Sequence, residues 1–162
     1  MFKLKYKFTI LAVCGMLYAI LYQCLVDKDF KPFSLSIDMT KSESRKYLED
    51  GWQVISREGK PDYVYTYGKD KASLLNVQLP EETNWTLRMK LKFAKSGQKI
   101  KVYANETLIG EARGYEGKVI GTWYWTLPKE AAIQGLNRIR IENSDPSLKI
   151  LYDGIAFKNY RG

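Results

Sequence analysis

Alternation of apolar and polar side chains is the feature of this sequence that most constrains its fold. It is clearest between Trp85 and Phe93, where every second residue is apolar and the residues between them are threonine, arginine or lysine. Successive side chains of a β-strand point to opposite faces of its sheet. The pattern therefore predicts a strand with one buried face and one solvated, cationic face.

The same period of two recurs from residue 33 to the end of the chain. Ten segments are predicted as strands: residues 33–39, 51–57, 62–67, 75–79, 85–93, 100–104, 107–112, 119–127, 136–142 and 148–159. Turn residues such as Gly59-Lys60-Pro61 separate them, and residues 42–50 and 128–134 are predicted to be short helical connectors. About ten short strands with one-sided burial predict an all-β fold, an antiparallel β-sandwich of jelly-roll type.

An apolar run precedes this predicted domain. Residues 8–26 carry no charge, and nineteen residues in a helix span about 28 Å, close to the thickness of a bilayer core. Three lysines precede the run, and Tyr6 and Tyr22 lie near its ends, where interfacial tyrosines are common. The run is therefore predicted to be a transmembrane signal anchor of a single-pass membrane protein, with a cytoplasmic N-terminus and an extracytoplasmic C-terminal domain.

Two alternatives to an uncleaved anchor are a cleaved signal peptide and a buried core helix. Residues 21–29 lack the small-x-small pattern of a cleavage site, and Val13 and Gln23, which precede the two cysteines, do not fit a lipoprotein signal. The expected organisation is a cytoplasmic stub and anchor over residues 1–26, a tether over residues 27–32 and an exported domain over residues 33–162.

Composition excludes several kinds of chemistry. There is no histidine, and both cysteines (Cys14 and Cys24) lie inside the apolar run, so the domain has neither a thiolate zinc site nor a cysteine nucleophile. A nucleophile elbow, a P-loop and a dinucleotide fingerprint are also absent, and the glutamates fall at expected turns and strand ends. We therefore expect no enzyme, with an envelope hydrolase as the alternative.

The net charge of +8 bears on the partners. An excess of this size favours anionic neighbours such as phospholipid headgroups or acidic glycans. The sequence has no Arg-rich helix, zinc pattern or RNA-binding aromatic signature, so we expect no nucleic-acid partner.

Several segments of the predicted domain occur in a characteristic order. They are SRKYL at residues 44–48, Gly51-Trp52, ASLLNVQLP at residues 72–80, QKIKVYANETLIGEA at residues 98–112, and the stretch at residues 124–144. This order resembles the galactose-binding-like jelly-roll domains, the fold of many carbohydrate-binding modules, some of them attached to membrane glycosyltransferases and other cell-envelope glycan proteins. The resemblance implies a hairpin at residues 102–110, with Asn105-Glu106 in place of the usual Asn-Gly, and a closing segment before the last strands. A shared fold is weak support for a shared ligand.

A tyrosine-rich strand is the first candidate binding site. Tyr63, Tyr65 and Tyr67 share one strand face, and aromatic rings commonly hold sugars by stacking on their apolar C–H surfaces. If Val64 on the opposite face points inward, the three tyrosines form an exposed platform. If the tyrosines point inward, they belong to the core.

The other aromatic candidates are single residues. Tyr115 lies in a glycine-flanked loop, where a contact with a ligand is possible. The resemblance places the face of Trp123 and Trp125 in the core, which leaves Tyr124 pointing outward as a further candidate. Trp52 follows a turn glycine and is expected to pack across one end of the sandwich.

The sequence also contains candidates for a metal site and for glycosylation. Related modules often hold a structural calcium ion between an early loop and the last strand, which makes Asp38 and Asp153 weak metal candidates, although calcium needs six to eight oxygen ligands. We expect no cofactor. The sequons beginning at Asn84 and Asn105 are host-dependent glycosylation sites, and Asn105 falls at the predicted hairpin tip, where a glycan is expected to be tolerated.

These observations lead to one preferred function and two alternatives. The preferred function is a membrane-anchored, non-enzymatic module of carbohydrate-binding type in the cell envelope, with the lipid bilayer and a glycan as its partners. The first alternative is an accessory subunit of a larger membrane protein complex, for example with a glycosyltransferase. Gly15 and Ala19 would let the anchor pack closely against such a partner. The second alternative is the hydrolase.

Overall fold

The computed structural model describes residues 34–66, 72–115 and 119–159. The predicted anchor, the tether and Tyr67 lie outside these residues. Within the described part of the chain, no helix combines the length and the apolarity that crossing a membrane requires.

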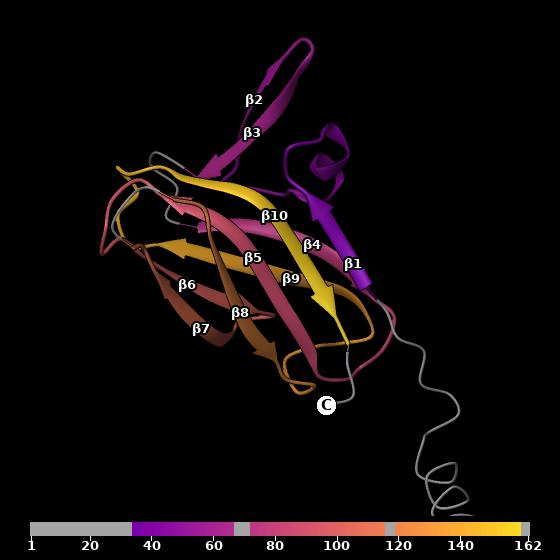
Figure 1. The fold of residues 1–162 in the computed structure, drawn as a ribbon. Helices are drawn as coiled ribbons and strands as arrows, with labels where there is room; N and C mark the ends of the chain where they lie inside the picture. Colours follow the sequence, from indigo (N-terminus) through magenta and orange to yellow (C-terminus); the bar gives the residue numbers. More distant parts are fainter. Residues whose placement is uncertain (1–33, 67–71, 116–118, 160–162) are drawn as a thin grey trace, which may run out of the picture. The chain divides into compact units, whose positions relative to one another are not determined.

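Ten described strands form two antiparallel sheets that pack against each other (Figure 1). In chain order they are β1 (Ser34–Asp38), β2 (Gln53–Arg57), β3 (Lys60–Thr66), β4 (Ala72–Leu79), β5 (Trp85–Phe93), β6 (Lys99–Ala104), β7 (Thr107–Arg113), β8 (Gly121–Leu127), β9 (Gly135–Asn143) and β10 (Ile150–Lys158). One sheet has the order β2-β3-β10-β5-β8, with β1 also pairing with β10, and the other has the order β4-β9-β6-β7. The predicted all-β antiparallel sandwich is confirmed.

The core lies between the two sheets and is built by alternation. Along β5, the five apolar residues from Trp85 to Phe93 are buried, and the residues between them face outward. The strand register places Met89 between Ile155 of β10 and Trp123 of β8, so that apolar side chains of three neighbouring strands meet on the inner face. The prediction of a cationic outer face for this strand is therefore confirmed.

Strand β10 changes partners along one of its edges. Its first residues, Ile150–Tyr152, pair with β3, whereas its later residues, from Gly154 to Lys158, pair with β1. The register of β10 against β5 shifts between Tyr152 and Gly154, which makes Asp153 a bulge residue. Bulges bend a strand and increase its twist. The β2–β3 hairpin projects beyond the rest of the sheet (Figure 1).

The two predicted helical connectors have different outcomes. The first forms a short 3₁₀-helix, η1 (Ser42–Tyr47). The prediction for residues 128–134 is wrong, because this segment is a turn in which the Pro128 carbonyl accepts hydrogen bonds from the amides of Ala131 and Ala132. The side chain of Asn137 takes the next amide, that of Ile133, so the turn is not continued as a helix.

Asn105 and Glu106 form the tip of the β6–β7 hairpin, as the resemblance implied. Both have positive φ angles, 45° and 70°, which are typical of a type I′ turn. The Asn105 amide nitrogen donates to the Ala131 carbonyl (3.0 Å) and to Asn137 Oδ1 (2.8 Å). Its oxygen accepts a hydrogen bond from the Arg138 amide (2.9 Å). Asn105 thus links the hairpin tip to the turn before β9 and to β9 itself.

Candidate functional site

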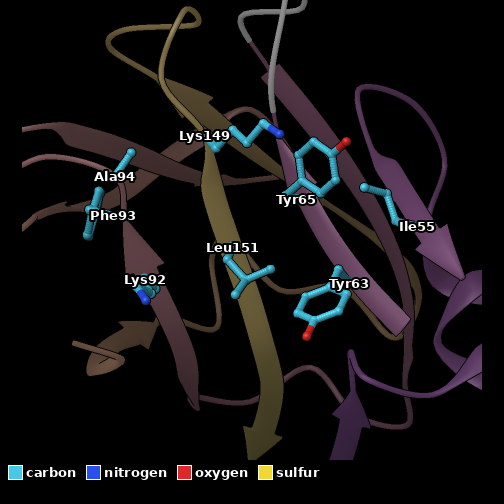
Figure 2. Close-up of a pocket in the computed structure, with 8 residues that line it drawn as sticks. All are labelled: Ile55, Tyr63, Tyr65, Lys92, Phe93, Ala94, Lys149 and Leu151. Atoms are coloured by element: carbon cyan, nitrogen blue, oxygen red, sulfur yellow. The ribbon is translucent and has the colours of Figure 1, made fainter. Parts of the chain in front are cut away.

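An apolar hollow with aromatic walls lies on the outer face of the six-stranded sheet (Figure 2). Its volume is about 380 Å³. We call it the aromatic hollow. Its lining residues are Ile55, Tyr63, Tyr65, Lys92, Phe93, Ala94, Lys149 and Leu151.

Strand register explains why these distant residues meet. Ile55 of β2 pairs with Tyr63 of β3, and Leu151 of β10 lies between Tyr65 of β3 and Lys92 of β5. Directly paired residues share a face of the sheet. Four strands therefore contribute outward-facing side chains to one site, with Leu151 between the tyrosines and Lys92 (Figure 2).

The tyrosine strand takes the orientation expected of a platform. Val64 is fully buried in the core, so Tyr63 and Tyr65 point to the outer face. Their exposures differ: Tyr63 is 46% exposed, whereas Tyr65 is only 9% exposed. The Lys149 ammonium group lies 4.8 Å from the centre of the Tyr65 ring. Tyr63 therefore offers the larger open aromatic surface.

The hollow has the chemistry of a binding site. Apolar and aromatic groups form most of it, and Lys92 and Lys149 supply hydrogen-bond donors at its margins (Figure 2). None of its eight described lining residues is an acid. Hydrolysis of a glycosidic bond usually requires two carboxyl groups across a cleft. The described lining thus offers an apolar surface with cationic groups at its margins.

The projecting hairpin is fastened to η1 on the side away from the tyrosines. Arg45 donates hydrogen bonds to Asp62 Oδ2 (2.8 Å) and to the Ser56 hydroxyl, and the Asp62 amide donates to the Thr40 carbonyl (2.8 Å). The hydrogen bond from the Ser56 hydroxyl and the guanidinium of Arg45 hold the pKa of Asp62 below its ordinary value of 3.8. This cluster attaches the part of the hairpin near its turn, beside Tyr63, to η1 and to Thr40.

Two predicted aromatic candidates lie outside the hollow. Tyr124 is 64% exposed on the outer face of β8, paired with Arg88. Tyr115 is also 64% exposed, and one face of its ring stacks on Trp123 with the ring centroids 5.5 Å apart. Trp125 is buried and donates to the Glu111 carbonyl, in agreement with its expected place in the core.

Trp52 has the structural role expected of it. It packs edge-to-face on Tyr152, with the ring centroids 4.9 Å apart, and its indole nitrogen donates to the Leu74 carbonyl (2.6 Å). Gly51 before it has a φ of +74°, and a Cβ atom there would lie 1.9 Å from the Ala72 carbonyl oxygen. Glycine is therefore required for the chain to pass β4 at this point.

The two metal candidates, Asp38 and Asp153, come close together because Asp38 pairs with Gly154. The Asp38 carboxylate accepts hydrogen bonds from the hydroxyl (2.6 Å) and amide (3.0 Å) of Thr40 and forms an ion pair with Lys41 (3.5 Å). These contacts, with the Thr40 hydroxyl foremost, lower the pKa of Asp38. In the part of the chain that is described, no three His, Cys, Asp or Glu residues converge in a way that could hold a metal ion.

The glycosylation candidates differ in what their side chains do. Asn105 uses both hydrogens of its amide nitrogen in bonds to Ala131 and Asn137, and a glycan would replace one of them. Asn84 is exposed, and its oxygen accepts a hydrogen bond from the Lys129 amide (2.9 Å). A glycan at Asn105 would therefore disturb the hydrogen bonds of the hairpin tip, although the sequence led us to expect that it would be tolerated there.

Sequence reasoning missed six of the eight residues that line the hollow: Ile55, Lys92, Phe93, Ala94, Lys149 and Leu151. Alternation already indicated that Lys92 faces outward. The insertion of β10 between β3 and β5, which brings Leu151 beside Tyr65, has no signal in the local pattern.

Comparisons with known proteins match this architecture to a group of solved structures. No family model matches the chain, and no curated protein matches it in sequence. A family 35 carbohydrate-binding module from an environmental isolate has a TM-score of 0.58 at 12% identity, covering 75% of this chain and 90% of that one. The C-terminal family 6 module of a marine laminarinase from Zobellia galactanivorans has a TM-score of 0.55 at 15% identity, covering 78% of this chain and 100% of that one.

A third similar structure is a family 36 carbohydrate-binding module in complex with calcium and xylotriose. Its TM-score is 0.51 at 12% identity, and the match covers 77% of this chain and 98% of that one. At such identities the likeness concerns the fold alone. The described domain therefore has the galactose-binding-like jelly-roll fold that these carbohydrate-binding modules share.

Proposed function

We propose that this protein is a non-enzymatic glycan-binding module and that the aromatic hollow is its binding site. The observation that carries the proposal is the pair of outward-facing tyrosines, Tyr63 and Tyr65, beside an apolar floor at Leu151. The similarity to carbohydrate-binding modules supports it at the level of the fold. The absence of acids from the described lining favours binding over hydrolysis.

A sugar ring suits this hollow for physical reasons. The C–H face of a pyranose ring is apolar and can stack on the exposed ring of Tyr63. The hydroxyl groups at its rim can accept hydrogen bonds from the ammonium groups of Lys92 and Lys149. The site therefore pairs an apolar surface with polar groups at its edge, as small-molecule sites generally do.

The substitution Tyr63→Ala tests the proposal. We expect it to weaken binding of the preferred polysaccharide by about tenfold, which corresponds to the loss of one aromatic stacking contact. Because Tyr63 is 46% exposed, the melting temperature should change little. Binding can be measured by affinity electrophoresis on a panel of neutral and acidic polysaccharides, followed by calorimetry on those that bind.

Tyr115→Ala is the matched control, because Tyr115 is an exposed tyrosine outside the hollow. It should bind like the wild type. If Tyr63→Ala also binds like the wild type, the hollow is not the site. If no polysaccharide binds to the wild type, the accessory-subunit hypothesis gains weight instead.

We also propose that residues 8–26 anchor the domain on the outer side of a membrane. The support is the uncharged apolar run and the three lysines before it. In a chain with Cys14 and Cys24 changed to serine, an impermeant maleimide added to intact cells should label Lys95→Cys and should not label Lys5→Cys. Labelling of both positions, or of Lys5→Cys alone, would contradict this topology.

A further inference from the structure

We infer that the glycan is a polyanion, and that it extends from the aromatic hollow along a row of cations on β5. The row consists of Lys92, Lys90 and Arg88, which we call the β5 cation row. This inference rests on the proposed function of the hollow and adds to it the chemical class of the ligand.

The β5 cation row begins inside the hollow. Lys92 is one of the lining residues, and Lys90 and Arg88 follow it at alternate positions of the same strand. Side chains two residues apart on a strand lie on one face, about 7 Å from each other. The row therefore forms a straight line of positive charge that leads away from Tyr63 and Tyr65.

Lys90 is exposed, and Arg88 and Lys92 at the two ends of the row are half-buried. Lys90 lies between Gly154 of β10 and Thr122 of β8, and Arg88 lies between Ala156 and Tyr124. Gly154 and Thr122, which flank Lys90, are small. Tyr124, 64% exposed beside Arg88, adds an aromatic surface at the far end of the row.

The two outer faces of the sandwich differ in how many of their cationic side chains form ion pairs. On the four-stranded sheet, Lys101 is paired with Glu111 (3.8 Å), Arg138 with Glu49 (2.9 Å), and Arg140 with Glu106 (3.2 Å) and Glu142, whereas Lys99 and Arg113 form no ion pair with a described acid. Among the described residues, no carboxylate lies within ion-pairing distance (4.0 Å) of the charged groups of the β5 cation row. This includes Asp153, at the bulge beside Gly154.

This difference between the two faces indicates that the ligand carries negative charge. A cation whose charge is not balanced within the fold gains most from a partner that carries negative charge, because charge-assisted hydrogen bonds are the strongest of their kind. A neutral glycan could offer Lys90 and Arg88 only uncharged acceptors, whose hydrogen bonds are weaker. A linear polysaccharide with regularly spaced carboxylates can stack one sugar in the hollow and place its acidic groups along the row.

The test measures binding of the full chain, solubilised in a non-ionic detergent, to matched polysaccharides. Polygalacturonate, alginate and hyaluronate serve as acidic probes, and methyl-esterified polygalacturonate, galactan and xylan serve as neutral ones. We expect binding of at least one acidic probe, with an affinity that falls as salt is added. The substitution Lys90→Ala should weaken that binding by about tenfold, as expected for the loss of one charge-assisted hydrogen bond.

Lys99→Ala is the matched control, because Lys99 is an exposed strand lysine at the start of β6 in the opposite sheet. It should leave the affinity unchanged. Equal losses in Lys90→Ala and Lys99→Ala would overturn the inference in favour of general charge attraction. Binding confined to neutral probes, lost in Tyr63→Ala and kept in Lys90→Ala, would overturn the polyanion while leaving the proposed function intact. Failure of every probe would overturn both.

Discussion

The side chain of Tyr65 is both outward-facing and covered. Its ring lies on the face opposite the buried Val64, yet Lys149 lies over it and Leu151 is its paired neighbour on β10. Such a residue supports the shape of the aromatic hollow and contributes little open surface. Stability and binding are therefore separable between Tyr65 and Tyr63.

Tyr65→Ala should lower the free energy of unfolding by about 3 kcal/mol, because it removes a large and nearly buried ring. Tyr65→Phe keeps the ring and should change stability by less than about 1 kcal/mol, since only the hydroxyl is lost. Urea denaturation followed by tryptophan fluorescence measures both. A near-neutral Tyr65→Ala would show that the ring is not packed as described.

Asn137 is a buried polar residue whose hydrogen bonds hold the segment between β8 and β9. It accepts hydrogen bonds from Asn105 and the Ile133 amide, and it donates to the carbonyls of Ile133 and Gly135. Asn137→Ala leaves several of these groups unsatisfied and should destabilise the domain by about 3 kcal/mol. Asn76→Ala, at a half-buried position on β4, should cost less than about 1 kcal/mol in the same denaturation assay. Equal effects would mean that the network contributes no stability.

At the scale of elements, the β2–β3 hairpin depends on a carboxylate. The pKa of Asp62 is lowered in the folded state, so the folded state binds its proton less readily than the unfolded chain does. The stabilisation from Asp62 is therefore fully present above the ordinary pKa of 3.8 and is lost as the pH falls through the folded value. Acid should therefore loosen the hairpin, because protonation of Asp62 removes its ion pair with Arg45.

The unfolding free energy of the wild type should decline more steeply than that of Asp62→Asn as the pH is lowered from about 6 to about 3. Asp38, whose pKa is also lowered, contributes to the decline in both proteins. Glu58→Gln, an exposed carboxylate in the turn of the same hairpin, should keep the wild-type slope. An unchanged slope in Asp62→Asn would mean that this ion pair is not formed in solution.

The elements also show how far sequence reasoning reaches. Alternation predicted β5 with its bounds, and it placed Tyr63 and Tyr65 on one face, because burial on one side imposes a period of two. It could not predict that β10 pairs with both β3 and β5, since partner choice depends on contacts between distant segments. Leu151 and Lys149 entered the site through that pairing, whereas Ile55 entered it through the β2–β3 hairpin. Residues 128–134 failed as a helix because the Asn137 side chain captures a backbone amide.

At the scale of the whole molecule, the domain has its own closed core. Residues from Phe33 to Gly162 form one compact unit, and both sheets contribute buried apolar side chains to one cluster. Residues 30–162 expressed alone should therefore fold as a soluble monomer with a cooperative thermal transition and a β-type circular dichroism spectrum. A predominantly helical spectrum or a non-cooperative melt would contradict the fold.

The short contact between β3 and β10 has a thermodynamic consequence for any ligand of the hollow. β3 pairs with β10 at Ile150, Leu151 and Tyr152, whereas β5 follows β10 along nearly its full length. The hairpin can thus open locally at a smaller free-energy cost than global unfolding. Affinity is then scaled by the fraction of molecules in which the hairpin is closed. A bound ligand should slow hydrogen exchange at the amides of β2 and β3 and leave that of the central strands of the opposite sheet unaltered.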